Sequence, residues 1–253
     1  MNYYIEHFEG DREKAIRLLD KVNRVKSSWG EEFTDFLNPD EQLLVKNICS
    51  SEGLYCRFFG GKGNFERAVG VISPYEYFGD FPVDFIKITG NFKFEKLSHR
   101  DYLGSILSLG IKREKIGDIN TYEDGAEIAV HRDISDYICF NIDKIKHTGV
   151  KLQKIPFDDL RERALKLKEM VVNAASLRLD SIVAGVTGMS RAEASGTIKG
   201  GGVKVNYALV CEPSKNIKEG DMISIRGYGR YKFESLLGKT KRDRITLQIN
   251  KYI

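Results

Sequence analysis

The stretch SLRLDSIVAGVTGMSRAEASGTIKGGGVKVN, residues 176–206, decides the fold of the last part of the chain. Its pattern predicts two short helices, a glycine-rich turn and a strand. The first helix should start near Ser176, and the capping-box spacing of Ser190 and Glu193 predicts that the second begins at Ser190. The stretch carries four basic residues against two acidic ones. A compact basic surface of this kind is typical of proteins that bind the phosphate backbone of RNA.

Within and after this stretch we predict one set of side chains that contact RNA. Arg191 lies in the first turn of the second helix, where free N–H groups attract phosphate and a guanidinium adds a bidentate donor. A strand ISIRGYGRYKF (223–233) follows a turn at Gly220-Asp221, and a hairpin loop GKTKRDR (238–244) adds a second basic cluster. The predicted set is Arg178, Ser190, Arg191, Lys199, Lys204, Asn206, Arg226, Arg230, Lys232, Lys239, Lys241, Arg242 and Arg244.

This pattern resembles the S-four RNA-binding domain, named after protein four of the small ribosomal subunit. The matching residues are Arg178-Leu179-Asp180, Ser190-Arg191, Lys199-Gly200, Val203-Lys204-Val205-Asn206, Pro213 and Gly220-Asp221. The resemblance implies that the two helices and the following turn grip structured RNA, usually ribosomal or transfer RNA. We expect Asp180 to orient Arg178 or to close a local hydrogen bond, and to take no part in chemistry.

The resemblance extends to the YlmH family of bacterial S-four proteins. It is carried by SHRDYLGSILSLGIKREKIGDI (98–119), by SLRLD and SRAEA in the stretch above, and by ISIRGYGRYKF with GKTKRDR. Membership implies an N-terminal unit, an RNA-recognition-like middle domain and a terminal S-four domain. It also implies binding to ribosomal RNA and tRNA on large ribosomal subunits blocked by peptidyl-tRNA. The implied process is ribosome-associated quality control, in which alanine tails mark the nascent chain, and a cell-division role is implied more weakly.

We therefore expect an α+β protein of three small units, over residues 1–73, 74–165 and 166–253. In the first unit, apolar spacing predicts a helix over 11–26. Asn38 and Glu41 predict the capped start of a helix that runs to about Ser50. A hairpin with a glycine-rich turn should complete this unit, with its strands at 54–59 and 67–72.

The middle unit reads as a split-βαβ sheet with helices on one face. The predicted strands lie at 83–90, 115–123, 126–131 and 150–155, and the predicted helices at 98–109 and 133–145. A short connecting helix over 156–165 and a strand over 168–174 should follow. The aromatic side chains that stack on bases in RNA-recognition domains are missing from GAEIAVH (125–131), so a structural or protein-binding role stays open for this sheet.

Composition separates a basic end from a near-neutral body. From Ala174 to the end the chain holds 14 Lys and Arg against 7 Asp and Glu, a balance of +7. The first 173 residues hold 26 against 29, a balance of −3. A basic terminal domain on a near-neutral body is typical of a protein whose end meets a polyanion.

Several classes of protein are disfavoured by the sequence. It has no apolar run of 18 residues and no signal-peptide layout at its start, so we expect a cytoplasmic protein with no membrane partner. The four cysteines are scattered, as are the histidines, so we expect buried free thiols, no metal site and no cofactor. We also expect a monomer.

Two alternatives to a non-catalytic RNA-binding factor stay open. One is an RNA-modifying enzyme with an unrecognised active site in the first 165 residues. Arg178-Leu179-Asp180 is superficially similar to the catalytic triplet of one pseudouridine synthase class, but the residues that follow lack its Thr-Ser-Gly pattern. GGKGNFE (60–66) joins two strands and does not match a nucleotide-binding loop. The other alternative is an adaptor associated with cell division.

Overall fold

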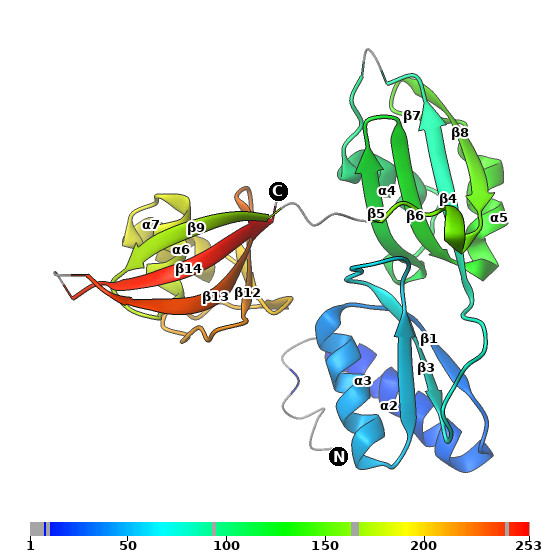
Figure 1. Ribbon diagram of the computed structural model, residues 1–253, viewed down its shortest axis with the longest axis horizontal. Helices are drawn as coiled ribbons and strands as arrows, with labels where there is room; N and C mark the ends of the chain where they lie inside the picture. The colour runs from blue at the N-terminus through cyan, green and yellow to red at the C-terminus, as the bar shows by residue number, and fades with distance from the viewer. Residues whose placement is uncertain (1–7, 9–10, 93–94, 163–166, 241–242, 253) are drawn as a thin grey trace. The chain divides into compact units, whose positions relative to one another are not determined.

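The computed structural model describes the following residues: 8, 11–92, 95–162, 167–240 and 243–252. The chain divides into two compact units, Met1–Ala164 and Leu165–Ile253, and each combines helices with antiparallel sheets (Figure 1). The predicted α+β class is confirmed. A boundary at residue 73 inside the first unit stays a prediction. No helix of the described residues is long and apolar enough to cross a membrane.

The first unit begins with a three-stranded sheet whose one face packs against two helices. Its elements are α2 (Arg12–Ser28), β1 (Glu32–Leu37), α3 (Pro39–Ser51), β2 (Tyr55–Phe59) and β3 (Ala68–Ser73), with strand order β1-β3-β2. Both predicted helices and the predicted hairpin of β2 and β3 are confirmed. Strand β1 was not predicted. Phe36 and Leu37 at its end are both buried, in different apolar clusters, so the strand lacks a clean alternation of apolar and polar residues.

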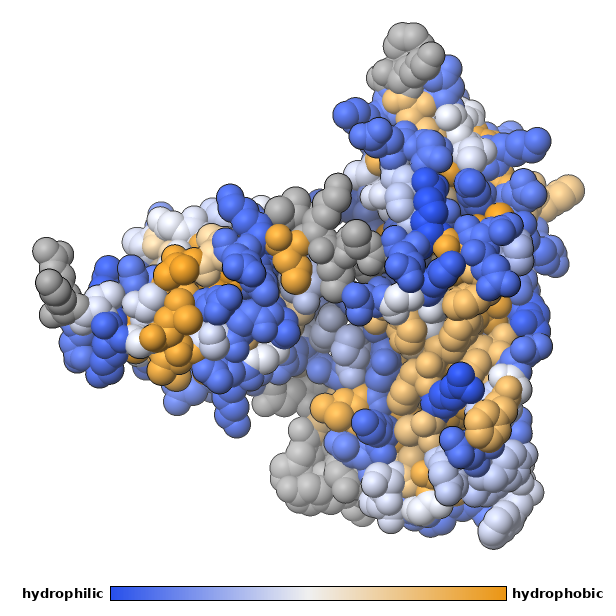
Figure 2. Space-filling model, in the orientation of Figure 1, coloured by the Kyte–Doolittle hydropathy of each residue, from blue (hydrophilic) through white to orange (hydrophobic). Residues whose placement is uncertain are grey.

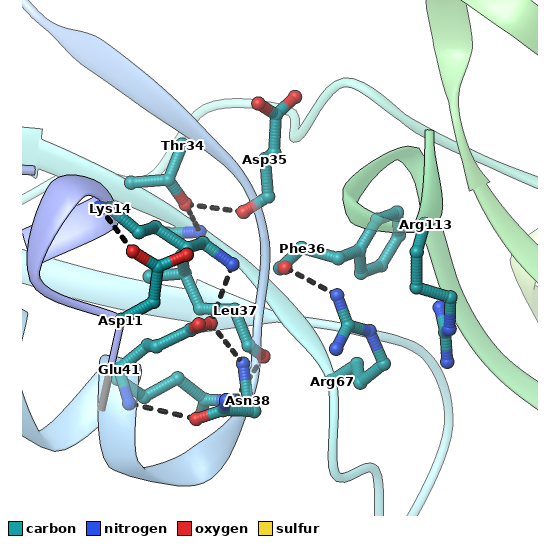
Figure 3. Close-up of polar contacts among 12 residues, drawn as sticks. Asp11, Lys14, Thr34, Asp35, Phe36, Leu37, Asn38, Glu41, Arg67 and Arg113 are labelled. Carbon is teal, nitrogen blue, oxygen red and sulfur yellow. Dashed lines mark hydrogen bonds and ion pairs between the residues drawn. The ribbon is translucent and has the colours of Figure 1, made fainter. Parts of the chain in front are cut away.

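The start of α3 is held by the predicted capping box. Asn38 Oδ1 accepts a hydrogen bond from the Glu41 N–H at 3.0 Å, and the Glu41 carboxylate accepts one from the Asn38 N–H at 2.8 Å. Lys14 of α2 donates to the same carboxylate at 2.8 Å (Figure 3). Because the Glu41 side chain is buried, this ion pair ties α2 to the first turn of α3.

The first unit continues with a five-stranded sheet and two helices. The elements are β4 (Val83–Gly90), α4 (His99–Leu107), a 3-10 turn η1 (Arg113–Lys115), β5 (Ile116–Tyr122), β6 (Gly125–His131), α5 (Arg132–Asn141), β7 (Lys144–Ile145) and β8 (Thr148–Ile155). The strand order is β5-β6-β4-β8-β7, which confirms the predicted split-βαβ arrangement. Ile86 and Ile88 of β4 pack with Tyr102 and Ile106 of α4 and with Ile138 of α5, so both helices cover one face of the sheet.

Two predicted helices of this region are wrong in part. The helix predicted over 133–145 ends at Asn141, and residues 144–145 form β7, paired with the start of β8. Ile138, Ile142 and Ile145 all pack in the same core, so their helical spacing extends past the true end of the helix. The connecting helix predicted over 156–165 is a single 3-10 turn, η2 (Phe157–Asp159), and residues 163–166 lie outside the described residues.

The segment after η2 is extended because its side chains are bound to the sheet. Leu160 is buried in an apolar cluster. The Arg161 guanidinium lies 2.8 Å from carboxylate oxygens of both Asp124 and Glu127, and its carbon lies 3.6 Å from the centre of the Tyr122 ring. These contacts fix the chain in a conformation that helical spacing did not predict.

A second apolar layer lies between the two sheets of the first unit. Phe36, Val69 and Val71 of the three-stranded sheet pack with Phe85 and Ala129 of the five-stranded sheet. The layer therefore covers the face of the five-stranded sheet that lies opposite α4 and α5. RNA-recognition domains use this face to stack bases. Its burial here accounts for the missing stacking aromatics on β6, where residues 125–130 are all buried.

The closest approach in this layer is between Phe36 and Gly117 of β5. A Cβ atom at Gly117 would lie 2.5 Å from Cε1 of Phe36 and 2.9 Å from Cβ of Ala129. Arg67 surrounds this contact with hydrogen bonds to the carbonyl oxygens of Phe36 at 2.8 Å and Ile116 at 3.0 Å (Figure 3). Glycine is therefore required for the two sheets to pack at this distance.

The second unit is a six-stranded sheet with two helices on one face. Its elements are β9 (Leu167–Ala174), α6 (Leu179–Thr187), α7 (Arg191–Lys199), β10 (Val203–Val205), β11 (Ala208–Leu209), β12 (Met222–Ile225), β13 (Gly229–Lys239) and β14 (Ile245–Tyr252). The strand order is β11-β10-β12-β13-β14-β9. Ile182 and Val183 of α6 and Ile198 of α7 pack on Tyr231 and Phe233 of β13 in one core.

Two expectations for this unit need correction. The helix α6 begins at Leu179, not near Ser176, because Ser181 Oγ accepts hydrogen bonds from the N–H groups of Ala175 and Ser176 and holds them outside the helix. ISIRGYGRYKF is not one strand but a hairpin of β12 and β13, since Gly227 has a positive φ of 84° and turns the chain. The predicted strand over 168–174 and the α7 capping box are confirmed.

We predict that Gly117→Ala lowers the free energy of unfolding of the first unit by about 1–3 kcal/mol, because the added methyl group overpacks the layer between the sheets. Urea denaturation followed by the fluorescence of Trp29, the only tryptophan, measures this effect. Gly104→Ala in α4 is the matched control, since a Cβ there meets nothing within 4 Å. The control should stabilise the helix by about 0.5–1 kcal/mol. If both variants gain stability, the close packing at Gly117 is wrong.

Candidate nucleic-acid interface

Asp180 joins two of the predicted RNA-binding arginines at the start of α6. Arg178 donates through Nε at 3.2 Å and through Nη2 at 3.1 Å to the two carboxylate oxygens. Arg191 donates to the same pair through Nε at 3.1 Å and Nη2 at 3.4 Å. The Asp180 side chain is 6% exposed, whereas those of Arg178 and Arg191 are 40% and 53% exposed. One buried carboxylate thus holds two partly exposed guanidinium groups, and we name these three residues the arginine clasp.

The charges of the clasp stabilise one another. Burial of the Asp180 carboxyl disfavours its ionised form, but hydrogen bonds from Arg178 and Arg191 outweigh this effect and hold its pKa below the ordinary value. The hydrogen bond to Asp180 in turn raises the pKa of Arg178. The clasp is therefore fully ionised at neutral pH and carries one net positive charge.

Backbone contacts fix the clasp from the α6 side. Arg178 is the N-cap residue of α6. The N–H groups of Leu179 and Asp180 donate to the carbonyl oxygens of Lys215 at 2.8 Å and of Pro213 at 3.0 Å. These amides are therefore bound within the unit, and Arg178 supplies its phosphate-binding capacity through its side chain alone.

The α7 side positions Arg191. Ser190 caps the helix by accepting a hydrogen bond from the Glu193 N–H at 3.2 Å, and the Glu193 carboxylate accepts one from the Ser190 N–H at 2.8 Å. Arg191 is thus the first helical residue, at the end where unpaired N–H groups favour an anion. Gly188 has a φ of 77°, which lets the chain turn from α6 into α7 and brings Arg191 beside Asp180. Lys199 lies exposed at the opposite end of α7.

A second group of predicted residues lies on the other face of the sheet. Lys204 of β10 pairs with Ser224, which pairs with Arg230 of β13, so they form one row across the strands. Their neighbours in sequence, such as Val203 and Tyr231, point into the core beneath α6 and α7. The row is thus on the face away from the helices. The structure therefore brings Arg178 and Arg191 together but separates them from Lys204 and Arg230.

Other members of the predicted set have partners or lie at turns. Lys232 forms an ion pair with Glu234 at 3.0 Å, and the Arg230 guanidinium lies 5.4 Å from the centre of the Tyr252 ring. Arg226 is exposed in the turn between β12 and β13. At the end of the β13–β14 hairpin, Arg244 is exposed and Lys239 pairs with Asp243 at 2.9 Å. Lys241 and Arg242 lie outside the described residues.

Asn206 has a role inside the unit. Its φ is 47°, and its side chain donates to Asp221 at 2.8 Å and accepts from the Met222 N–H at 2.8 Å. Both ends of the amide are therefore used to join the end of β10 to the start of β12. The prediction that Asn206 contacts RNA did not foresee this internal use.

The sequence did not reveal every part of the site. The link from Asp180 to Arg191 was missed, because the two residues are 11 positions apart and meet only through the turn at Gly188. Lys215 was missed as well, although its segment lies along the first turn of α6. Pro213, which belongs to the S-four pattern, marks this segment. Among the described residues no group of His, Cys, Asp and Glu could hold a metal ion.

The expectation of buried free thiols is correct only in part. All four cysteines are free, and Cys49 is buried. Cys211 is exposed, because it lies in the segment that connects β11 to β12 and not in the core.

Comparisons with known proteins agree with an RNA-binding chain. Residues 77–159 match the family model described as "Putative RNA-binding domain in YlmH". These residues include most of the five-stranded sheet and its two helices. The ribosome-associated protein quality control protein P2 of Bacillus subtilis (strain 168) is 32% identical over 258 residues, which cover 99% of this chain and 100% of that protein.

A solved structure is similar as well. It is the cell division protein ylmH from Streptococcus pneumoniae, with a TM-score of 0.51 and 28% sequence identity. The match covers 59% of this chain and 93% of the solved chain. Because the Bacillus subtilis relative matches along its whole length and the family model matches the middle of the chain, the protein belongs to the YlmH family.

Proposed function

We propose that this protein is a non-catalytic RNA-binding factor that acts on large ribosomal subunits carrying stalled peptidyl-tRNA. The observation that carries the proposal is the arginine clasp, which presents two guanidinium groups from one buried carboxylate. The name of the Bacillus subtilis relative, which refers to ribosome-associated quality control, supports the ribosomal part of the proposal.

The clasp suits a phosphate backbone for geometric reasons. A guanidinium has five N–H donors, and each arginine gives Nε and Nη2 donors to Asp180, so donors remain on each group for a phosphate. Because both side chains are already fixed by Asp180, little rotamer entropy is lost when RNA binds. The balance of +7 in residues 174–253 attracts the polyanion from a distance.

We infer a division of labour within the predicted set. Arg178, Arg191 and Lys199 on the helix side form the main grip of what we propose to be an S-four domain, with Ser190 fixing the helix end. Lys204, Arg226, Arg230 and Lys232 offer a second basic area along the sheet face and its hairpin turn. The hairpin with Lys239, Lys241, Arg242 and Arg244 extends the basic surface further. Ribosomal RNA and tRNA are the partners that such a surface fits.

The proposal includes the setting of the protein. We propose a cytoplasmic monomer without cofactor that supports the alanine tailing of stalled nascent chains by holding RNA and not by chemistry. An enzyme is the less favoured alternative, because the Asp180 carboxylate that the catalytic triplet would need receives four hydrogen bonds from two arginines. The name of the Streptococcus pneumoniae protein, which refers to cell division, keeps a division-associated adaptor as a second candidate.

We predict that Arg178→Ala and Arg191→Ala each weaken binding to ribosomal RNA fragments. Each should also reduce the slope of log K against log salt by about one unit, since one phosphate contact and its released counterion are lost. Titrations at several salt concentrations measure both quantities. Arg24→Ala is the matched control, because Arg24 is an exposed arginine that pairs with Glu32 in the first unit. Unchanged slopes in both clasp variants mean that the grip lies elsewhere, for example in residues 239–244.

We predict that Asp180→Asn destabilises the region around α6 and α7 by about 1–2 kcal/mol at pH 7, because the two arginines lose their shared anion. The pKa of Asp180 is lowered on folding, so its contribution is present above its ordinary value of 3.8 and is lost as the pH falls through the lower folded value. The difference between wild type and variant should therefore shrink below about pH 4.

Hydrogen exchange of the α6 and α7 amides in the full chain measures this effect. Glu234→Gln is the control, since Glu234 pairs with a partly exposed lysine and should change stability by less than about 0.5 kcal/mol. Equal protection in wild type and Asp180→Asn at neutral pH contradicts the role given to the clasp.

We predict that the purified protein co-sediments with large ribosomal subunits carrying peptidyl-tRNA. The double variant Arg178→Ala/Arg191→Ala should dissociate at a lower salt concentration than wild type, because it releases fewer counterions on binding. Sedimentation through sucrose at a series of salt concentrations gives the comparison. Absence of the wild-type protein from every ribosomal particle at all salt concentrations would favour the division-associated adaptor.

A further inference from the structure

The first unit carries a groove of about 310 Å³ that has no part in the function proposed above. Its floor is formed by β2 and β3, and its wall by the segment between β3 and β4. The lining residues are Tyr55, Cys56, Arg57, Val71, Glu76, Tyr77 and Phe78. Figure 2 shows hydrophobic side chains gathered over the sheet of β1 and β3 on this unit.

The aromatic rings of the groove differ in mobility and exposure. The Tyr77 ring packs edge-on against Phe33 and Phe81, with centroids 5.7 Å and 5.8 Å away, and its hydroxyl donates to the Asp80 carbonyl at 2.7 Å. Tyr77 is therefore fixed. Tyr55 and Phe78 are 53% and 77% exposed. Exposed rings beside a groove favour a ligand with flat apolar faces, which would remove them from water.

The polar groups of the groove narrow the class of ligand. Arg57 donates one hydrogen bond, from Nη1 to the Tyr77 carbonyl at 3.2 Å, which leaves further N–H donors of this exposed side chain for an anion. Glu76 supplies a carboxylate that accepts hydrogen bonds from amino groups. A nucleotide offers a flat base, an amino group on three of the four bases and a phosphate, and so matches the rings, Glu76 and Arg57.

We propose that this groove binds one unpaired nucleotide of a single-stranded RNA segment. The base stacks on Tyr55 and Phe78, its amino group donates to Glu76, and its phosphate receives Arg57. The inference rests on the proposed function in one respect, namely that the protein meets RNA. A single-stranded segment is needed because the bases of a duplex are stacked on one another and cannot enter a groove.

Two further observations limit the site to a single nucleotide in this unit. Glu31, whose carboxylate accepts from the Tyr75 hydroxyl at 2.7 Å, and Asp80 lie on the segments around the groove. Their negative charges oppose a run of phosphates but not one neutral base. The five-stranded sheet does not compete for the base, because Phe36 and Leu160 belong to the apolar layer on its open face.

Binding of fluorescein-labelled single-stranded RNA hexamers to the full chain tests the inference. Phe78→Ala should weaken hexamer binding about tenfold, the usual effect of losing one stacked base, and should leave the salt slope unchanged. Phe140→Ala on α5 is the matched control, since this phenylalanine is 89% exposed and lies outside the groove. Glu76→Gln should change the order of affinities among the four homopolymer hexamers, because an amide both donates and accepts.

Ultraviolet cross-linking of the same hexamers, followed by peptide mapping, separates this inference from the proposed function. The inference expects cross-links at Tyr55 or Phe78. Cross-links confined to residues 167–252, with Phe78→Ala binding like Phe140→Ala, overturn the groove site and leave the proposed function intact. If a pool of random hexapeptides binds wild type but not Phe78→Ala, and no RNA cross-links to the groove, the groove is a peptide site and the inference is wrong. Loss of hexamer binding in Arg178→Ala/Arg191→Ala with groove cross-links retained supports two separate sites.

Discussion

The interaction on which the second unit and its proposed function depend is the sharing of one carboxylate by two arginines. Asp180 is buried, and an isolated buried carboxylate is costly, so Arg178 and Arg191 are both needed to keep it ionised. In return, the carboxylate holds two cations close together that would otherwise repel each other. The carboxylate thereby links the start of α6 to the start of α7, and a feature of stability becomes a rigid surface for phosphate.

The first unit shows how packing can change the use of a familiar fold. Its five-stranded sheet has the strand order of a split-βαβ domain, yet its open face is filled by Phe36, Val69 and Val71 from the neighbouring sheet. The contact of Phe36 with Gly117 and the hydrogen bonds of Arg67 keep this face closed. The platform on which such domains stack bases is therefore absent, and the exposed rings of Tyr55 and Phe78 lie instead beside a groove of the three-stranded sheet.

Local patterns were enough to predict most of the elements. The capping boxes at Asn38 and Ser190 predicted both helix starts, because these hydrogen bonds link residues three positions apart. Predictions failed where distant contacts decide the structure. The extended segment at Leu160 depends on the apolar layer and on Arg161, and the early part of SLRLD stays outside α6 because Ser181 binds its backbone. The division of the basic residues between two faces depends on strand pairing, which no short motif contains.

The central claim is that the clasp of Arg178, Asp180 and Arg191 grips RNA phosphate on the large ribosomal subunit. A particle image of the protein bound to large subunits from cells, at a resolution that shows side chains, tests this claim most directly. We predict that both guanidinium groups lie within hydrogen-bond distance of phosphate oxygens, with Asp180 still between them. A complex in which α6 and α7 face solvent, while another surface of the chain contacts the RNA, would contradict the claim.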